Sequence, residues 1–144
     1  MTTILAIPGS WRSGSYNLAL ARAAQALAPA GCTVELASIA AIPVYDGDNE
    51  AAQGVPVPVA ELKDRIAAAD ALVLVTPEYN NSVPGPLKNA IDWLSRPASD
   101  LARVFGDKPT GLIGASPGPG GTRLAQAAWL PVLRLLGTRP WFGK

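Results

Sequence analysis

Short apolar runs alternate with longer segments rich in Ala and Leu along the chain. The clearest run is residues 71–75, Ala-Leu-Val-Leu-Val, which has the composition of a strand buried on both faces of a parallel sheet. The intervening segments are rich in helix formers, and prolines and glycines mark their ends. The predicted strands are residues 4–7, 33–36, 71–75 and 111–115, and the predicted helices are residues 18–27, 59–69, 86–94 and 124–136.

This alternation predicts an α/β fold, in which right-handed crossovers place helices on both faces of a parallel sheet. Such sheets bind ligands beyond the carboxyl ends of their strands, at the point where the strand order reverses. We therefore expect the functional residues in three loops, which are residues 8–17, 76–85 and 116–122.

Length and composition suit a packed globule. The 144 residues predict one domain spanning 1–144, and 49% hydrophobic residues with a net charge of +1 argue against a disordered or nucleic-acid-binding chain. Residues 1–7 contain no cationic leader, and no apolar run is long enough to span a membrane. A single cysteine, Cys32, cannot form an internal disulfide, so the cytoplasm is the expected location.

The chain contains no histidine, which excludes a Ser-His-Asp triad, a Cys-His pair and a histidine-ligated metal site. One cysteine cannot supply a multi-cysteine zinc or iron–sulfur site, and the carboxylates lack calcium-loop spacing. We therefore predict no metal site. Any demanding chemistry belongs to an organic cofactor.

The first loop, Gly-Ser-Trp-Arg-Ser-Gly-Ser-Tyr-Asn at 9–17, has the donors of a phosphate site. Backbone N–H groups at the start of the following helix, the Arg12 guanidinium and the hydroxyls of Ser10, Ser13 and Ser15 can all donate to phosphate oxygens. The loop lacks both the G-x-G-x-x-G fingerprint and the Lys-Ser/Thr ending of a Walker loop, so a monophosphate fits better than a pyrophosphate or triphosphate. The alternative is an ordinary turn with a serine cap.

The other two loops are suited to a flat ring. In residues 76–86, prolines stiffen the backbone, Tyr79 can lie against a ring, and amides from Glu78 to Asn80 can bond its edge. The alternative is a structural turn before a helix that starts with proline. Residues 116–122 carry little side chain, which lets another molecule approach the backbone closely.

Taken together, the three loops resemble those of the NADPH-dependent FMN reductase family, a flavodoxin-like group that includes chromate and quinone reductases. The resemblance rests on Gly-Ser-Trp-Arg at 9–12 with Ser15 and Asn17, on the long motif of residues 76–93, and on the Gly-rich residues 114–121. It implies a three-layer α/β/α fold whose parallel sheet has the strand order 2-1-3-4-5.

The resemblance also implies a cofactor, FMN, with NADPH or NADH as co-substrate and with the hydride chemistry on the flavin. The implied FMN-binding residues are Ser10, Arg12, Ser15, Tyr16 and Asn17 for the phosphate, Pro77, Glu78, Tyr79 and Asn80 for the ring, and Ser116 and Gly118 for the ribityl and ring side. The implied acceptors are small molecules, namely quinones, azo compounds, free flavins or chromate.

Family members are commonly homodimers or homotetramers, with the helix after Pro86 at an interface. Trp93 would pack there, although a place in the protein core is an equal alternative for this residue. The family's chain continues past a fifth strand into a last helix. This sequence ends at Lys144, so we expect the carboxyl-terminal strand and helix to be incomplete.

Two other functions remain open. A flavodoxin-like electron carrier would bind FMN and accept electrons from a protein, but the near-neutral charge lacks the acidic docking surface typical of carriers. A non-catalytic FMN-binding redox sensor would keep the fold without turning over NADPH. Direct reduction of bound flavin by a nicotinamide, followed by repeated reoxidation, distinguishes a reductase from both.

Overall fold

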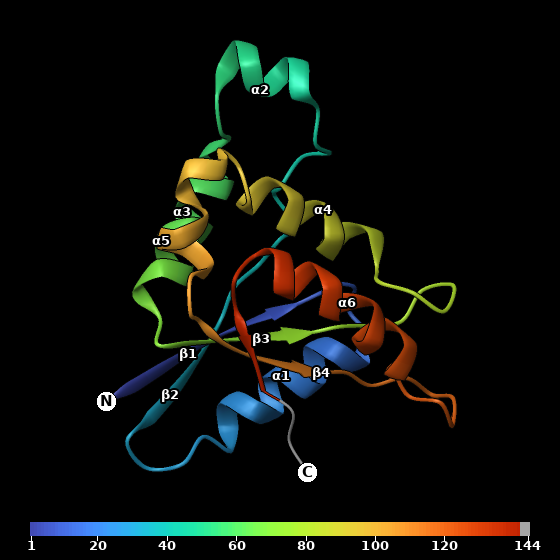
Figure 1. Ribbon diagram of the computed structural model, residues 1–144. Helices are drawn as coiled ribbons and strands as arrows, with labels where there is room; N and C mark the ends of the chain where they lie inside the picture. Colours follow the sequence, from blue (N-terminus) through green and yellow to red (C-terminus); the bar gives the residue numbers. More distant parts are fainter. Residues whose placement is uncertain (142–144) are drawn as a thin grey trace.

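The computed structural model describes residues 1–141, which form a five-stranded sheet flanked by helices (Figure 1). All strand pairs are parallel, and the strand order is β2-β1-β3-β4-β5, which confirms the predicted flavodoxin-like topology. The strands are β1 (Thr2–Pro8), β2 (Cys32–Leu36), β3 (Ala71–Val75), β4 (Pro109–Ile113) and β5 (Arg139–Pro140). The carboxyl-terminal strand and helix were expected to be incomplete, and the last three residues of the sequence, 142–144, lie outside the described residues.

Four of the helices match the predicted segments within a few residues, whereas α2, α5 and the short 3-10 turn were not predicted. The helices are α1 (Tyr16–Ala26), α2 (Gly47–Gln53), α3 (Val57–Ala68), α4 (Gly85–Leu94), α5 (Leu101–Phe105) and α6 (Arg123–Leu135), with η1 (Ala98–Asp100) before α5. Helix α2 buries no residue, so it carries no apolar periodicity; its Asp46 cap instead accepts from the N–H groups of Asp48 and Asn49. None of the helices within residues 1–141 is long and apolar enough to cross a membrane.

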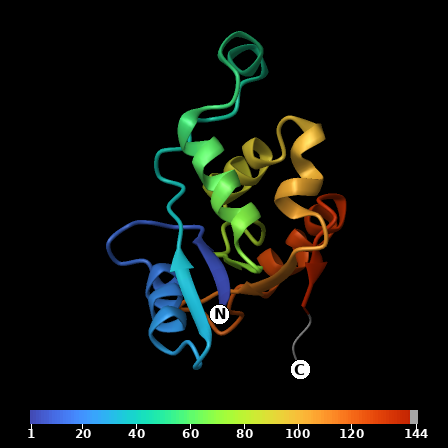
Figure 2. The same cartoon turned by 90° about the vertical axis from the view of Figure 1, so that its left-hand side faces the viewer.

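The two faces of the sheet are covered differently. Helices α3, α4 and α6 pack on one face against Leu5, Ile7 and the even-numbered residues of β3. Helix α1 packs on the opposite face through Ala21, against Ala6 and Val34 (Figure 2). Because side chains alternate along each strand, the fully apolar strands supply both cores.

Trp93 belongs to the larger core of this chain. Its side chain is 1% exposed, and its indole N–H donates to the Pro43 carbonyl over 3.0 Å. The ring also meets Tyr45 edge to face, with 4.9 Å between the ring centroids. Of the two alternatives for Trp93, the protein core is the one that the structure shows.

Strand β4 ends two residues earlier than predicted, because the chain turns away from the sheet at Gly114. A Cβ built on Gly114 would lie 2.1 Å from the Thr122 Oγ1 and 2.3 Å from the Thr76 carbonyl oxygen. The loop after β4 can therefore pack against the end of β3 only because residue 114 has no side chain.

Gly114→Ala should lower the free energy of unfolding by about 1–3 kcal/mol, because the added methyl group has to displace packed backbone. Gly120→Ala is the matched control, since a Cβ at Gly120 meets nothing within 4 Å and this residue lies in the same loop. Urea unfolding of both variants measures the difference, and equal stabilities would contradict the packing argument.

Candidate functional site

A small polar pocket lies beyond the carboxyl ends of β1, β3 and β4, where the three predicted loops meet. Its volume is about 110 Å³, and we call it the polar pocket. Its lining residues are Ser10, Arg12, Ser15, Tyr16, Asn17, Pro77, Glu78, Tyr79, Ala115, Ser116 and Pro117. Of the FMN-binding residues that the resemblance implied, all except Asn80 and Gly118 line this pocket, and it adds Ala115 and Pro117. Ser13, the further candidate phosphate donor, does not line it.

The amino end of α1 makes one side of the polar pocket electropositive. Ser15 caps the helix by accepting from the Leu18 N–H over 3.2 Å, and the first turn of α1 contains no acidic residue. The backbone N–H groups of Tyr16 and Asn17 therefore point out of the helix with no carboxylate to neutralise them. Arg12 is exposed, and no carboxylate within residues 1–141 forms an ion pair with it. This arrangement suits an anion.

Asn17 joins the first loop to the third. Its amide donates to the Ala115 carbonyl and accepts from the Ala115 N–H, both over 3.0 Å, and the side chain is 4% exposed. Both polar ends of the side chain are thus engaged with the protein. Residues 17 and 115 lie far apart in the sequence, and the resemblance implied only that Asn17 holds the phosphate.

A tight turn presents Tyr79 to the polar pocket. Tyr79 and Ser82 exchange two backbone hydrogen bonds, of 3.1 and 3.0 Å. Between them, Asn80 and Asn81 have positive φ angles of 51° and 59°, as in a two-residue type I′ turn. Asn tolerates this left-handed conformation better than most residues. Tyr79 remains 43% exposed and lines the pocket, whereas Asn80 is not among the lining residues.

Helix α6 anchors this second loop at two points. Glu78 Oε2 accepts from the N–H groups of Leu124 and Ala125, over 2.9 and 3.1 Å, and so caps a helix whose own Thr122 makes no cap bond. The second point is the buried Trp129, whose indole N–H donates to the Thr76 hydroxyl over 3.0 Å. Sequence reasoning missed Thr76 and Trp129, because only the fold brings these residues together.

The third loop is held by Ser116. Its hydroxyl lies 3.0 Å from the Gly121 carbonyl and 3.3 Å from the Gly118 carbonyl, so it closes the Gly-rich turn from inside. Ser116 lines the polar pocket and Gly118 does not. The two residues were predicted to act together, and the structure gives Ser116 the more direct position.

A second, larger pocket adjoins the first and shares Ser10 and Tyr79 with it. Its volume is about 500 Å³, and we call it the apolar pocket. Its lining residues are Gly9, Ser10, Trp11, Ile39, Ala40, Ile42, Val44, Tyr79, Gly85, Pro86 and Asn89. No charged residue is among them. Sequence reasoning did not identify this pocket, because residues 39–44 form no regular element and carry no motif.

Gly9 allows the two pockets to adjoin. A Cβ on Gly9 would lie 2.8 Å from Pro77 Cδ and 3.0 Å from Leu87 Cδ2. The absence of a side chain therefore lets the first loop lie directly against the second loop and α4.

Known proteins resemble the chain over nearly all its length. The family model for NADPH-dependent FMN reductases matches residues 2–142. An NAD(P)H-dependent FMN reductase of Pseudomonas aeruginosa is 47% identical over 137 residues, and a 2-hydroxy-1,4-benzoquinone reductase of a Burkholderia species is 43% identical over 124 residues. These alignments cover 95% and 86% of the chain, and 72% and 66% of the respective relatives.

A solved structure shares the fold closely. The flavoenzyme FerB of Paracoccus denitrificans, an NAD(P)H:(acceptor) oxidoreductase, superposes with a TM-score of 0.89 at 39% identity. The match covers 99% of the chain and 76% of FerB.

Glu78→Ala should lower the free energy of unfolding by about 1 kcal/mol, because two N–H groups at the start of α6 lose their acceptor. Glu61→Ala is the control, since Glu61 is an exposed carboxylate on α3 and forms no ion pair within residues 1–141. Urea unfolding without added ligand measures both variants. A stable Glu78→Ala protein would show that the carboxylate does not hold α6.

Proposed function

The chain belongs to the NADPH-dependent FMN reductase family, and from this premise we propose that it binds FMN and transfers electrons from NAD(P)H to small acceptors such as quinones. The observation that carries this proposal is the adjacency of two unlike pockets. The polar pocket offers N–H groups and a cation, the apolar pocket has no charged lining, and both include Ser10 and Tyr79. FMN has a phosphate at one end and a flat ring at the other. Its phosphate fits the polar pocket, its ring would lie against Tyr79 where the two pockets meet, and the rest of the apolar pocket is left for a flat acceptor.

The residues of the polar pocket fit the FMN phosphate. The free N–H groups of α1, the hydroxyls of Ser10 and Ser15 and the unpaired Arg12 supply donors and positive charge to a dianion. Pro77, Glu78, Tyr79 and Asn80 would border the ring, and Ser116 and Gly118 would line the ribityl and ring side of the site. Asn17 contributes its backbone N–H, because its amide is bound to Ala115.

Bound FMN supplies two-electron chemistry, in which hydride is taken up from NAD(P)H and two electrons are delivered to an acceptor. The chain's own contribution is to bind, align and exclude water. Its site needs no general acid or base, and the one carboxylate of the polar pocket, Glu78, is engaged with α6. The site thus accounts for catalysis in a chain that has no histidine.

We further propose that the protein is a single-domain homodimer or homotetramer of the cytoplasm, and that azo compounds, free flavins and chromate are further candidate acceptors. Self-association is supported by the apolar surface of α6 beside α4. Leu135 of α6 is 82% exposed, and a groove of about 270 Å³ runs past it between α4 and α6. The single cysteine suits a reducing compartment.

Anaerobic addition of NADPH to the FMN-loaded protein should bleach the flavin's visible absorbance, and a quinone should restore it. Stopped-flow absorbance measures both steps after free flavin has been removed. Retained flavin that NADPH does not bleach would instead favour an electron carrier or a redox sensor. A protein that retains no flavin would contradict the site assignment.

Arg12→Ala should weaken FMN binding by about 1.5–3 kcal/mol, or roughly 10- to 150-fold, because a charge-assisted hydrogen bond to the phosphate is lost. Riboflavin has no phosphate, so its affinity should stay the same. Arg22→Ala provides the control from an exposed arginine further along α1. Flavin fluorescence titrations give all the affinities, and an equal loss for FMN and riboflavin would remove Arg12 from the phosphate site.

A further inference from the structure

One wall of the apolar pocket is built from a segment without regular structure. Residues 37–46 connect β2 to α2 and contribute Ile39, Ala40, Ile42 and Val44 to the lining. We call them the β2–α2 segment. Figure 1 shows that α2, which follows the segment, stands away from the sheet. Packing of α2 on the core therefore cannot determine where this wall lies.

Side chains of α4 hold the segment instead. Asn89 donates to the Pro43 carbonyl and accepts from the Tyr45 N–H, both over 2.8 Å. The indole of Trp93, one helical turn further on, donates to the same Pro43 carbonyl over 3.0 Å. These bonds bracket Val44 on both sides and fix its backbone relative to the amino end of α4, where Gly85 and Pro86 also line the pocket.

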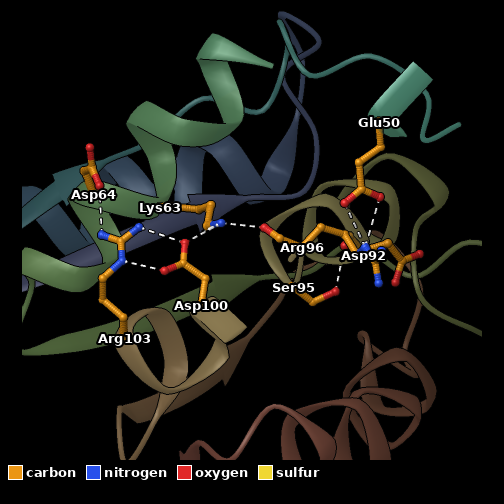
Figure 3. A network of polar contacts seen from close by, with 8 residues as sticks. All are labelled: Glu50, Lys63, Asp64, Asp92, Ser95, Arg96, Asp100 and Arg103. Atoms are coloured by element: carbon orange, nitrogen blue, oxygen red, sulfur yellow. Dashed lines mark hydrogen bonds and ion pairs between the residues drawn. The ribbon is translucent and has the colours of Figure 1, made fainter. Parts of the chain in front are cut away.

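A polar network secures the far end of the segment. The Tyr45 hydroxyl donates to Glu50 over 2.8 Å. Arg96 Nε lies 3.1 and 3.0 Å from the two Glu50 oxygens (Figure 3). The Tyr45 hydroxyl and Arg96 together hold the pKa of Glu50 below its usual value. The Arg96 carbonyl in turn accepts from the buried Lys63 of α3. The segment is thus tied to both α3 and α4.

Packing within the protein does not explain why the side chain at position 44 is apolar. It is apolar yet 83% exposed, and it packs against neither hydrophobic core, although its backbone is bracketed by hydrogen bonds. Exposed valines are common and need no explanation singly. Here, however, the side chain faces a pocket that has an aromatic ring, Tyr79, on its border and no charged residue in its lining.

We propose that the β2–α2 segment, positioned by Asn89, is the wall that selects flat, uncharged acceptors, and that Val44 is its specificity-determining side chain. This inference rests on the proposed function and deepens it. A quinone entering the apolar pocket buries its ring edge against Val44, whereas a compact hydrophilic anion gains nothing from that contact. Asn89 acts through Val44 and is a positioning residue.

Reoxidation of reduced enzyme by two unlike acceptors tests the proposal. The FMN-loaded protein is reduced with dithionite and mixed in a stopped-flow instrument with menadione, a neutral naphthoquinone, or with ferricyanide, a hydrophilic anion. The measured quantity is the ratio of the two second-order rate constants. Reduction by dithionite makes the measurement independent of NADPH, so it reports on the acceptor pocket alone.

Val44→Thr should lower the menadione-to-ferricyanide ratio roughly fivefold or more, because the change keeps the shape and adds a hydroxyl that a quinone ring would desolvate. Val57→Thr is the matched control. Val57 is 69% exposed at the start of α3 and lies outside the apolar pocket, so its ratio should stay within about twofold of the wild type. Asn89→Leu should shift the ratio in the same direction as Val44→Thr, because it removes both bonds that bracket Val44.

An unchanged ratio in Val44→Thr, or an equal loss with both acceptors, would overturn the proposal. The same would follow if Val57→Thr shifted the ratio as much as Val44→Thr. Failure of the proposed function has a different signature, since wild-type flavin would then resist reduction by NADPH while the dithionite experiment still gave a result.

Discussion

Pairing of β1 with both β2 and β3 is the constraint on which the rest of the structure depends. Because β1 lies between its two neighbours, the chain must leave it in one direction to reach β2 and return in the other to reach β3. Helix α1 therefore covers one face, and α3, α4 and α6 cover the other. The loops after β1 and β3 separate at this point and leave room for a ligand between them.

Each loop of the site is held in place by a side chain from another element. Asn17 of α1 holds Ala115 after β4, Glu78 after β3 holds the start of α6, and α6 returns a hydrogen bond from Trp129 to Thr76. These bonds join the loops to one another and to α6 without any ligand. A preformed site loses less entropy when it binds a cofactor.

The two pockets differ in their electrostatic character. The polar pocket collects positive potential from Arg12 and the α1 amino end. Elsewhere, Glu50 of α2 pairs with Arg96, and Lys63 and Asp64 of α3 pair with Asp100 of η1 and Arg103 of α5 (Figure 3). In that network, hydrogen bonds from Arg103 and Lys63 depress the pKa of Asp100. The apolar pocket has no charged residue in its lining. This separation keeps a neutral surface beside an anion-binding one.

The sequence by itself determined the order of strands and helices, because burial on a sheet or along a helix leaves a local pattern that can be read over a few residues. It also identified the loops of the polar pocket, because ligands of such sheets bind beyond the carboxyl ends of the strands.

Only the tertiary structure decided which partner each polar side chain takes. The amide of Asn17 binds Ala115, the carboxylate of Glu78 binds α6, and Asn89 holds a segment that has no periodicity of its own. The helices α2 and α5 and the apolar pocket escaped prediction for the same reason. A hydrogen bond between residues distant in the sequence depends on how the elements pack, and no local pattern records that choice.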